Sequence, residues 1–299
     1  MTLRAIAGLD RWLSRQNPAY RPVSRFVISC PQKVSAGSFT RGNVMIANYH
    51  THTARCHHAI GTEREYVENA IARGLKIFGF SDHTPQYFPG DYYSYMRMRP
   101  YELPEYCADV RRLQREFRDK IQIHLGMEVE YYPVSWNQLL PRLRDTGVEY
   151  MILGQHWLGN EENEDPCLRP TADEQRLRRY CCQVMEALET GKFTYFAHPD
   201  VLNFTGDRDI YRKLMREVIR TAKQTDTPLE INFVGIRSGR HYPSETLFEL
   251  VAEEDCPVVF GLDAHAPEHV LDPESEEKAL EMVHRLGLNL LETVPLKQL

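Results

Sequence analysis

Residues 44–58 read VMIANYHTHTARCHH, and this stretch organises the rest of the chain. The apolar run at its start is typical of a short buried strand, which then leads into a loop rich in imidazoles. Because side chains two positions apart in a strand point to the same face, His50 and His52 would be aimed at one point. Such a pair can hold a metal ion, but paired histidines also occur on ordinary surfaces. The rest of the sequence has to decide between these interpretations.

Downstream, apolar runs alternate with charged, amphipathic stretches. This alternation is typical of successive β-α units around a parallel sheet. Helices are expected over residues 63–73, 104–117 and 210–225, and strands over 76–80, 121–127, 150–155, 193–197, 229–232 and 258–262. We therefore expect residues 44–299 to form one α/β domain whose strands close into a barrel.

Most of the predicted strands end in a side chain that can bind a metal ion. The parallel strands of a barrel present their carboxyl ends at one rim, where the active sites of such folds are built. A single histidine at a strand end is more often a hydrogen-bonded filler than a ligand. Repetition reverses that expectation, because many of the histidines occupy such ends: His50, His52, His83, His156, His198 and His265.

The order of these motifs resembles the polymerase-and-histidinol-phosphatase (PHP) superfamily of metal-dependent phosphoesterases, and within it the histidinol-phosphatase branch. The similarity extends from Met45 to the C-terminus. It rests on separated motifs in the family's order: His50-Thr51-His52 with a further His58, Asp82-His83, Gly126-Met127-Glu128-Val129-Glu130, Gly154-Gln155-His156, Ala197-His198-Pro199-Asp200 and Gly261-Leu262-Asp263-Ala264-His265. The resemblance implies a distorted (β/α)7 TIM-like barrel with a metal cluster at the C-terminal rim of the strands.

The resemblance also implies three divalent metal ions. The first would be held by His50, His52, Glu128 and Asp263, the second by His58, His83 and His265, and the third by His156 and His198, with Glu128 bridging it to the first. His57 crowds His58 and makes the loop ligand ambiguous by one position. Imidazole nitrogen and carboxylate oxygen suit zinc, manganese or iron. Asp82 and Asp200 are interpreted as groups that orient imidazoles.

By the same resemblance, the chain would hydrolyse L-histidinol phosphate to L-histidinol and inorganic phosphate, a late step in histidine biosynthesis. A metal-activated hydroxide would attack the phosphate, and Glu128, Asp263 and His265 are expected to be catalytic.

Three arginines are expected to contact this substrate. Arg237 best fits a phosphate-binding arginine of the branch, and its planar fork suits phosphate. Arg240 is the competing candidate on the same loop. Arg97 lies in a Tyr-rich loop over residues 86–101, which is interpreted either as a lid over the substrate or as a structural flap.

Other functions stay open at this point. Related proteins of the superfamily hydrolyse phosphotyrosine on proteins or act on nucleic-acid ends, and another small phosphomonoester also fits the motifs. A metal-dependent amidohydrolase begins with His-x-His on a barrel strand too, but it usually bridges its metals through a modified lysine, a role that Glu128 fills better here. The non-enzymatic alternative is a metal-loaded binding protein, which an open coordination position would distinguish from an enzyme.

Composition narrows the range of partners. With 299 residues and 42% hydrophobic content, the chain can bury a large core. A net charge of -6 provides no basic field for nucleic acid, and no apolar run approaches the length of a membrane span. The seven cysteines lack both disulfide and Cys-x-x-Cys spacing, so we expect reduced thiols in a soluble cytoplasmic protein, with Cys56 serving in packing.

Residues 1–43 differ from the rest of the chain. Seven Lys and Arg residues face a single acid, Asp10, and the apolar residues show no sustained period. An Arg-rich leader can be a targeting segment. The favoured interpretation is a start codon upstream of Met45, giving a poorly ordered N-terminal extension.

Overall fold

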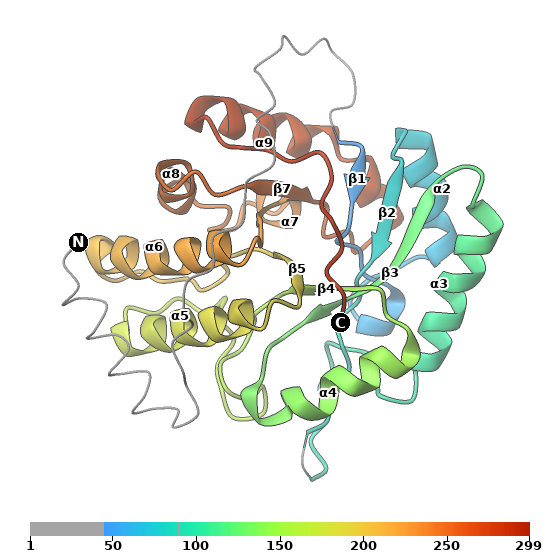
Figure 1. Ribbon diagram of the computed structural model, residues 1–299, viewed down its shortest axis with the longest axis horizontal. Helices are drawn as coiled ribbons and strands as arrows, with labels where there is room; N and C mark the ends of the chain where they lie inside the picture. Colours follow the sequence, from blue (N-terminus) through green and yellow to red (C-terminus); the bar gives the residue numbers. More distant parts are fainter. Residues whose placement is uncertain (1–44, 89) are drawn as a thin grey trace. The chain divides into compact units, whose positions relative to one another are not determined.

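The computed structural model describes residues 45–88 and 90–299. Seven strands form one sheet in sequence order, and every neighbouring pair of strands is parallel. They are β1 (Ala47–Asn48), β2 (Ile77–Phe80), β3 (Gln122–Val129), β4 (Tyr150–Leu153), β5 (Phe193–Phe196), β6 (Leu229–Asn232) and β7 (Val258–Gly261). Figure 1 shows the helices arranged around these strands.

The sheet closes between its first and last strands. Beyond the end of β1, Thr51 forms a parallel bridge with Ala264, and His52 N–H donates to the Ala264 carbonyl at 3.0 Å. Leu262 N–H donates to the side-chain oxygen of Asn48, also at 3.0 Å. The result is a nearly closed seven-stranded barrel, so the predicted (β/α)7 architecture is confirmed.

Three tyrosines, two from strands β4 and β5 and one from just after β1, pack together inside the barrel. Tyr49, Tyr150 and Tyr195 belong to one buried cluster, and the Tyr150 hydroxyl donates to the Tyr49 carbonyl at 2.7 Å. Each buried side chain of this size contributes roughly 1.5–3 kcal/mol through removal of apolar surface from water. The C-terminal segment adds Val294 to the same cluster, and Lys297 Nζ donates to the Thr225 carbonyl at 2.7 Å, just before β6. This segment therefore covers the amino-terminal ends of the strands, opposite the rim.

The helices begin and end where their capping residues dictate. Thr62 and Glu65 form a reciprocal capping box before α2, and Gly74, with φ of 91°, ends it. The longer helices are α2 (Glu63–Arg73), α3 (Leu103–Phe117), α4 (Pro133–Thr146), α5 (Glu174–Glu189), α6 (Arg208–Gln224), α8 (Glu245–Glu253) and α9 (Pro273–Leu286), and the short elements are α7 (Phe233–Arg237), η1 (Ala54–Cys56) and η2 (Pro267–Leu271).

Three differences from the sequence-based expectation bear on the site. Strand β1 ends at Asn48, so His50 and His52 follow the strand instead of ending it. Strand β3 continues to Val129 and includes Glu128. The segment expected to be a loop after β6 begins with helix α7, because the Asn232 side chain accepts a hydrogen bond from Gly235 N–H at 3.1 Å and caps it.

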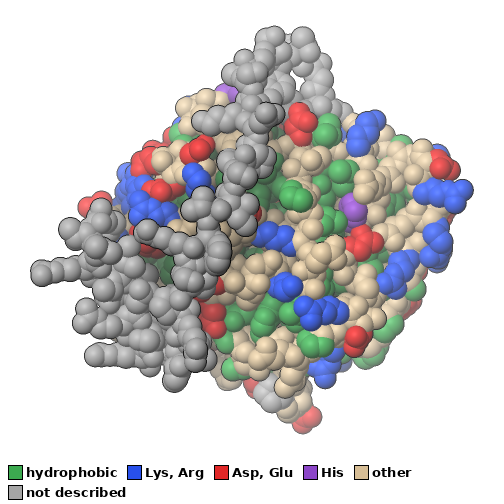
Figure 2. All heavy atoms as spheres, in the orientation of Figure 1, with side chains coloured by type: hydrophobic (Ala, Val, Ile, Leu, Met, Phe, Trp, Pro, Cys, Tyr) green, Lys and Arg blue, Asp and Glu red, His purple; other side chains and the backbone are tan. Residues whose placement is uncertain are grey.

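Two expectations about domain organisation stay predictions. The extension over residues 1–43 lies outside the described residues, and the assignment of 44–299 to one domain is not tested independently. Figure 2 shows basic and acidic side chains of the described residues interspersed on the visible face. No helix in the described part of the chain is long and apolar enough to cross a membrane. The six cysteines there are free thiols.

Candidate metal centre

Glu128 lies at the centre of a cluster of imidazoles at the carboxyl ends of the strands. Its Oε1 is 2.8 Å from His198 Nε2, and its Oε2 is 2.9 Å from His83 Nδ1. Nitrogens from three further rings lie 3.7, 3.6 and 3.8 Å from the same carboxylate, and they belong to His50, His52 and His156. One carboxylate thus faces five imidazoles that come from four different parts of the chain.

Asp263 is the second buried carboxylate of the cluster. Its Oδ1 lies 3.1 Å from His52 Nε2, 3.6 Å from His50 Nε2 and 3.3 Å from His265 Nδ1. Glu128 and Asp263 therefore share His50 and His52 between them. This is the arrangement expected of a site that holds several cations side by side.

A more open group of imidazoles borders this pair. The His58 ring lies 4.8 Å from that of His265 and 5.3 Å from that of His83, measured between centroids. His57 turns elsewhere, because its Nε2 is 2.7 Å from the Tyr93 hydroxyl. The geometry therefore favours His58 as the loop ligand. The Sγ of Cys56, which the sequence assigned to packing, also lies within 4.8 Å of ligand atoms of His52 and His265.

All nine side chains nominated by the sequence lie in this one connected cluster, but they are not equally close. Within the described residues, His156 belongs to none of the three-residue groups whose ligand atoms all lie within 4.8 Å of one another. Its link to the cluster is the 3.8 Å approach of its Nε2 to Glu128. The role of each side chain as a metal ligand stays a prediction.

Unpaired polar atoms inside the cluster fit a cation. Buried polar atoms in folded proteins nearly always have hydrogen-bond partners. Here three buried atoms that face other cluster members have none of acceptable geometry, namely Nδ1 of His83, Oε2 of Glu128 and Oδ1 of Asp263. Divalent ions that accept nitrogen and oxygen ligands would satisfy such atoms.

The pKa shifts of the buried carboxylates and imidazoles also fit a metal site. Burial alone would raise the pKa values of Glu128 and Asp263, but the surrounding imidazoles hold both well below the usual range. Burial lowers the pKa of His50, and the carboxylates of Glu230 and Asp263 outweigh it and raise that pKa to about 10. Burial and the neighbouring His52 instead hold the pKa values of His83 and His265 well below 6.5. The cluster thus contains neutral imidazoles that are free to act as ligands.

Carboxylates that the sequence analysis missed lie behind the imidazoles. Glu230 Oε1 is 2.7 Å from His50 Nδ1, which leaves His50 Nε2 facing the cluster. Its other oxygen accepts from His198 N–H at 2.9 Å and from Asn232 Nδ2 at 2.8 Å. Glu130 Oε1 lies in the same way 3.0 Å from His156 Nδ1. The sequence did contain a signal for Glu230: this acid and the amide Asn232 lie at alternate positions of the apolar run that forms the buried strand β6.

The two aspartates expected to orient imidazoles, Asp82 and Asp200, have different hydrogen-bond partners. Asp82 Oδ1 lies 3.4 Å from His52 Nδ1 and accepts from His83 N–H at 2.7 Å, so it does lie behind a cluster imidazole. Asp200 Oδ2 instead accepts from Ser244 N–H at 2.5 Å, at the start of α8. Burial raises the pKa of Asp200 to about 6. Its hydrogen bonding therefore serves the fold around α8.

Local backbone features make room for the carboxylates. A Cβ on Gly154 would lie 1.9 Å from Glu128 Oε1, and a Cβ on Gly261 would lie 1.7 Å from Glu230 Oε1. His198 and Asp263 have positive φ values of 30° and 47°, a region that costs a non-glycine residue about 1–3 kcal/mol. Glycine and backbone strain thus occur together at the cluster.

The three arginines nominated as substrate contacts have different surroundings. Arg237, at the end of α7, donates through Nη1 to Asp272 Oδ2 at 2.7 Å and is partly exposed. Arg240 is exposed and donates to the Tyr242 hydroxyl at 2.9 Å, and the Tyr242 ring lies 6.0 Å from that of His198. Arg97 is buried and bonded to protein groups. Their contacts with substrate stay predictions.

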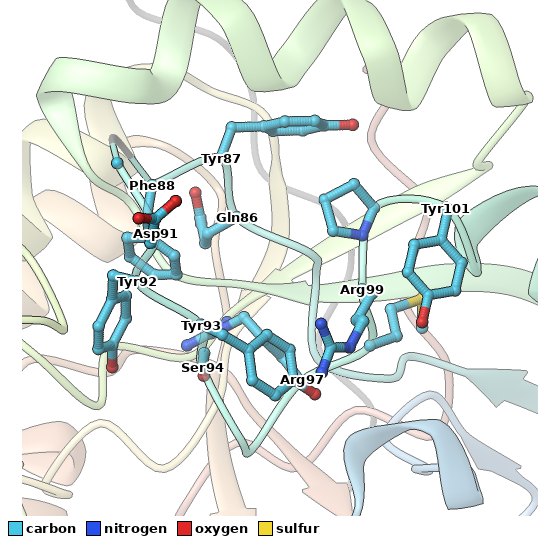
Figure 3. A pocket seen from close by; sticks show the side chains of 13 residues that line it. Gln86, Tyr87, Phe88, Asp91, Tyr92, Tyr93, Ser94, Arg97, Arg99 and Tyr101 are labelled. Atoms are coloured by element: carbon cyan, nitrogen blue, oxygen red, sulfur yellow. The ribbon is translucent and has the colours of Figure 1, made fainter.

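The Tyr-rich loop over residues 86–101 lines an open cavity of about 330 Å³ (Figure 3). Arg97 lines this cavity, but none of the nine candidate ligands does. The Arg99 guanidinium lies 3.5 Å above the Tyr93 ring, and the Tyr93 hydroxyl reaches His57. The loop is therefore attached to the edge of the cluster, and its function as a lid stays open.

The chain is similar in sequence to known histidinol phosphatases. The chain is 30% identical over 231 residues to a Deinococcus radiodurans protein named "Probable histidinol-phosphatase", covering 75% of this chain and 88% of that protein. It is 27% identical over 261 residues to the histidinol-phosphatase of Lactococcus lactis, covering 82% and 93%.

A solved structure of histidinol phosphate phosphatase from L. lactis, complexed with zinc, L-histidinol and phosphate, has the same fold. Its TM-score is 0.64 at 23% identity, and the match covers 83% of this chain and 98% of that chain. The family model described as the PHP domain matches residues 48–233. The match spans more than half of the chain and contains most of the imidazole cluster, and we conclude that this protein belongs to the PHP-domain family.

Proposed function

We propose that this protein is a metal-dependent phosphomonoesterase that hydrolyses L-histidinol phosphate to L-histidinol and inorganic phosphate. The observation that carries the proposal is the convergence of imidazoles on the buried carboxylates of Glu128 and Asp263. The choice of substrate is supported by the names of the D. radiodurans and L. lactis relatives, and by the L-histidinol and phosphate in the L. lactis structure.

The ligand sets of the proposal are those that the resemblance to the PHP superfamily implies. His50, His52, Glu128 and Asp263 would hold a first divalent ion, His58, His83 and His265 a second, and His156 and His198 a third that shares Glu128 with the first. Zinc is favoured over manganese and iron by its presence in the L. lactis relative. Three ions are proposed because the nine side chains supply more donor atoms than one or two ions would use.

Divalent ions at such a site supply positive charge to the phosphoryl oxygens and make a water molecule acidic enough to attack at neutral pH. The residues of the chain hold this arrangement in place. Glu230 and Glu130 fix the ring orientations of His50 and His156 by accepting from their Nδ1 atoms. Hydrolysis of a phosphate monoester is very slow in water, so this positioning and charge account for most of the catalysis.

The substrate would bind between the cluster and the segment that follows β6. Arg237 is our first candidate for the phosphate contact, because its Nη2 lies 3.4 Å from the carbonyl of Asp263 and hence beside the cluster. Arg240 is the alternative, since it reaches the Tyr242 hydroxyl near His198. Glu128, Asp263 and His265 are the proposed catalytic residues. The free thiols of the described cysteines support a cytoplasmic location.

The test is phosphate release from L-histidinol phosphate, compared with a phosphotyrosine peptide and p-nitrophenyl phosphate, with metal content measured on the same sample. We expect the highest kcat/KM for L-histidinol phosphate, and activity that rises with bound metal. Preference for the phosphopeptide would reject the substrate assignment. Full turnover by metal-free protein would reject the metal-dependent mechanism.

A further inference from the structure

Arg97 is a buried cation near the cluster, with 2% of its surface exposed. Its donors are taken up by protein acceptors from three segments. Nε and Nη2 donate to Glu161 Oε2 at 3.0 and 2.5 Å, and Nη2 also donates to Glu130 Oε1 at 3.1 Å. Nη1 donates to the Thr84 carbonyl at 3.1 Å. This guanidinium is therefore occupied by the protein, which does not suit a group that grips a phosphate.

The partner Glu130 connects Arg97 to the metal centre. The same oxygen that accepts from Arg97 lies 3.0 Å from His156 Nδ1, and the other oxygen accepts from the Tyr132 hydroxyl. With Nδ1 facing Glu130, the Nε2 atom of His156 faces Glu128 at 3.8 Å. A carboxylate behind a histidine fixes the proton on the rear nitrogen and leaves the front nitrogen free to bind a metal.

Glu161 completes the arrangement from the loop that follows β4. It is buried, and its Oε1 accepts from the Tyr92 hydroxyl at 3.4 Å. Arg97 lies between Glu161 and Glu130 and forms ion pairs with both, at 2.5 and 3.1 Å. Without this cation, two buried carboxylates would face each other unneutralised, an arrangement that a protein avoids by moving the groups apart.

We propose that Arg97 is a positioning residue: by holding the carboxylate of Glu130 against His156, it sets His156 to bind the third metal ion. The inference rests on the ligand sets of the proposed function. It also links the Tyr-rich loop to the metal centre, because Arg97 belongs to that loop and lines its cavity (Figure 3). The loop would then have to be in place before the third metal is held firmly.

The experiment challenges the purified, metal-loaded protein with increasing EDTA, and measures metals retained per chain together with steady-state phosphate release. We expect Arg97→Met to lose one metal at about 10-fold less EDTA than wild type, the lower end of the usual effect of removing the direct outer partner of a metal-binding histidine, because Arg97 acts on His156 through Glu130. Added zinc should restore kcat, and KM should stay near the wild-type value. Arg97→Lys keeps the charge but not the fork, so its loss of metal should be intermediate.

Arg73→Met is the matched control. Arg73 is also buried and paired with a carboxylate, Glu276, at 2.6 Å, but this pair ties α2 to α9, and Arg73 Nη1 also donates to the Val270 carbonyl at 2.5 Å. Arg73→Met should keep the wild-type EDTA profile even if its thermal unfolding midpoint falls. If Arg97→Met fails to fold, Arg97→Lys carries the test.

The proposal is overturned if a folded Arg97 variant keeps the wild-type EDTA profile. A raised KM in that variant would then indicate direct contact with substrate, and an unchanged KM would indicate no role at the site. His156→Ala separates this outcome from a failure of the proposed function. If His156→Ala keeps every metal, the ligand sets are wrong. If it loses one metal while the Arg97 variants lose none, only the positioning role of Arg97 is wrong.

Discussion

A single methyl group at Gly154 tests whether Glu128 has to stay where the structure places it. The Cβ of Gly154→Ala would lie 1.9 Å from Glu128 Oε1 and 2.5 Å from its Cδ. Non-bonded carbon and oxygen atoms approach to about 3.3 Å, so the carboxylate would have to move by more than about 1 Å. Metal–ligand distances tolerate only about 0.2 Å, and a shift of about 1 Å can reduce activity by roughly 100-fold.

We therefore expect Gly154→Ala to lose metal and to lose at least about 100-fold in kcat/KM for L-histidinol phosphate. Metals per chain, phosphate release and the thermal unfolding midpoint are measured on the same preparation. Gly261→Ala is the comparison, because its Cβ would displace Glu230, which holds His50, instead of a proposed ligand. Its effect should be smaller, about 10- to 100-fold. A folded Gly154→Ala protein with wild-type metal content and turnover would refute the role given to Glu128.

Three further predictions concern the substrate, pH and metal removal. Arg237→Ala should raise KM with little change in kcat, and an unchanged KM would transfer the phosphate contact to Arg240. Burial alone would raise the pKa of Asp272, but hydrogen bonds from Arg237 and Ser275 outweigh burial and lower this pKa. The ionised Asp272 therefore stabilises the folded protein above about pH 4, and this stabilisation is lost as the pH falls through the lowered pKa of the folded state. Asp272→Asn should keep the cap on α9, be less stable than wild type at pH 6, and approach wild-type stability near pH 3 in urea unfolding; an equal deficit at both pH values would contradict this. Dialysis against EDTA should abolish phosphate release and zinc or manganese should restore it, whereas activity that survives complete metal removal would count against the mechanism.

The parts of the fold that could be read from the sequence are those fixed by local patterns. The capping box at Thr62 and the glycine at position 74 are local signals that mark the two ends of α2, and α2 begins and ends where the sequence predicted. The apolar runs likewise located the strands, because parallel strands in a barrel are covered on both faces. The position of histidines at strand ends then indicated which rim holds the site.

The parts that could not be read depend on contacts between distant residues. Glu230 lies in β6 and acquires its role only because His50, 180 positions earlier, is brought within 2.7 Å. Nothing local distinguishes Arg97, whose donors are buried against Glu130 and Glu161, from an arginine that faces substrate. The helical start of the segment after β6 was missed because one side chain, Asn232, caps it.

The most direct test of the central claim is the number of metal ions per chain in wild type and in Glu128→Gln, measured with phosphate release on the same samples. We expect close to three ions and full turnover in wild type, with loss of both bound metal and activity in the variant, because glutamine removes the charge that the imidazoles and cations share. A Glu128→Gln protein that kept its metal and its turnover would contradict it.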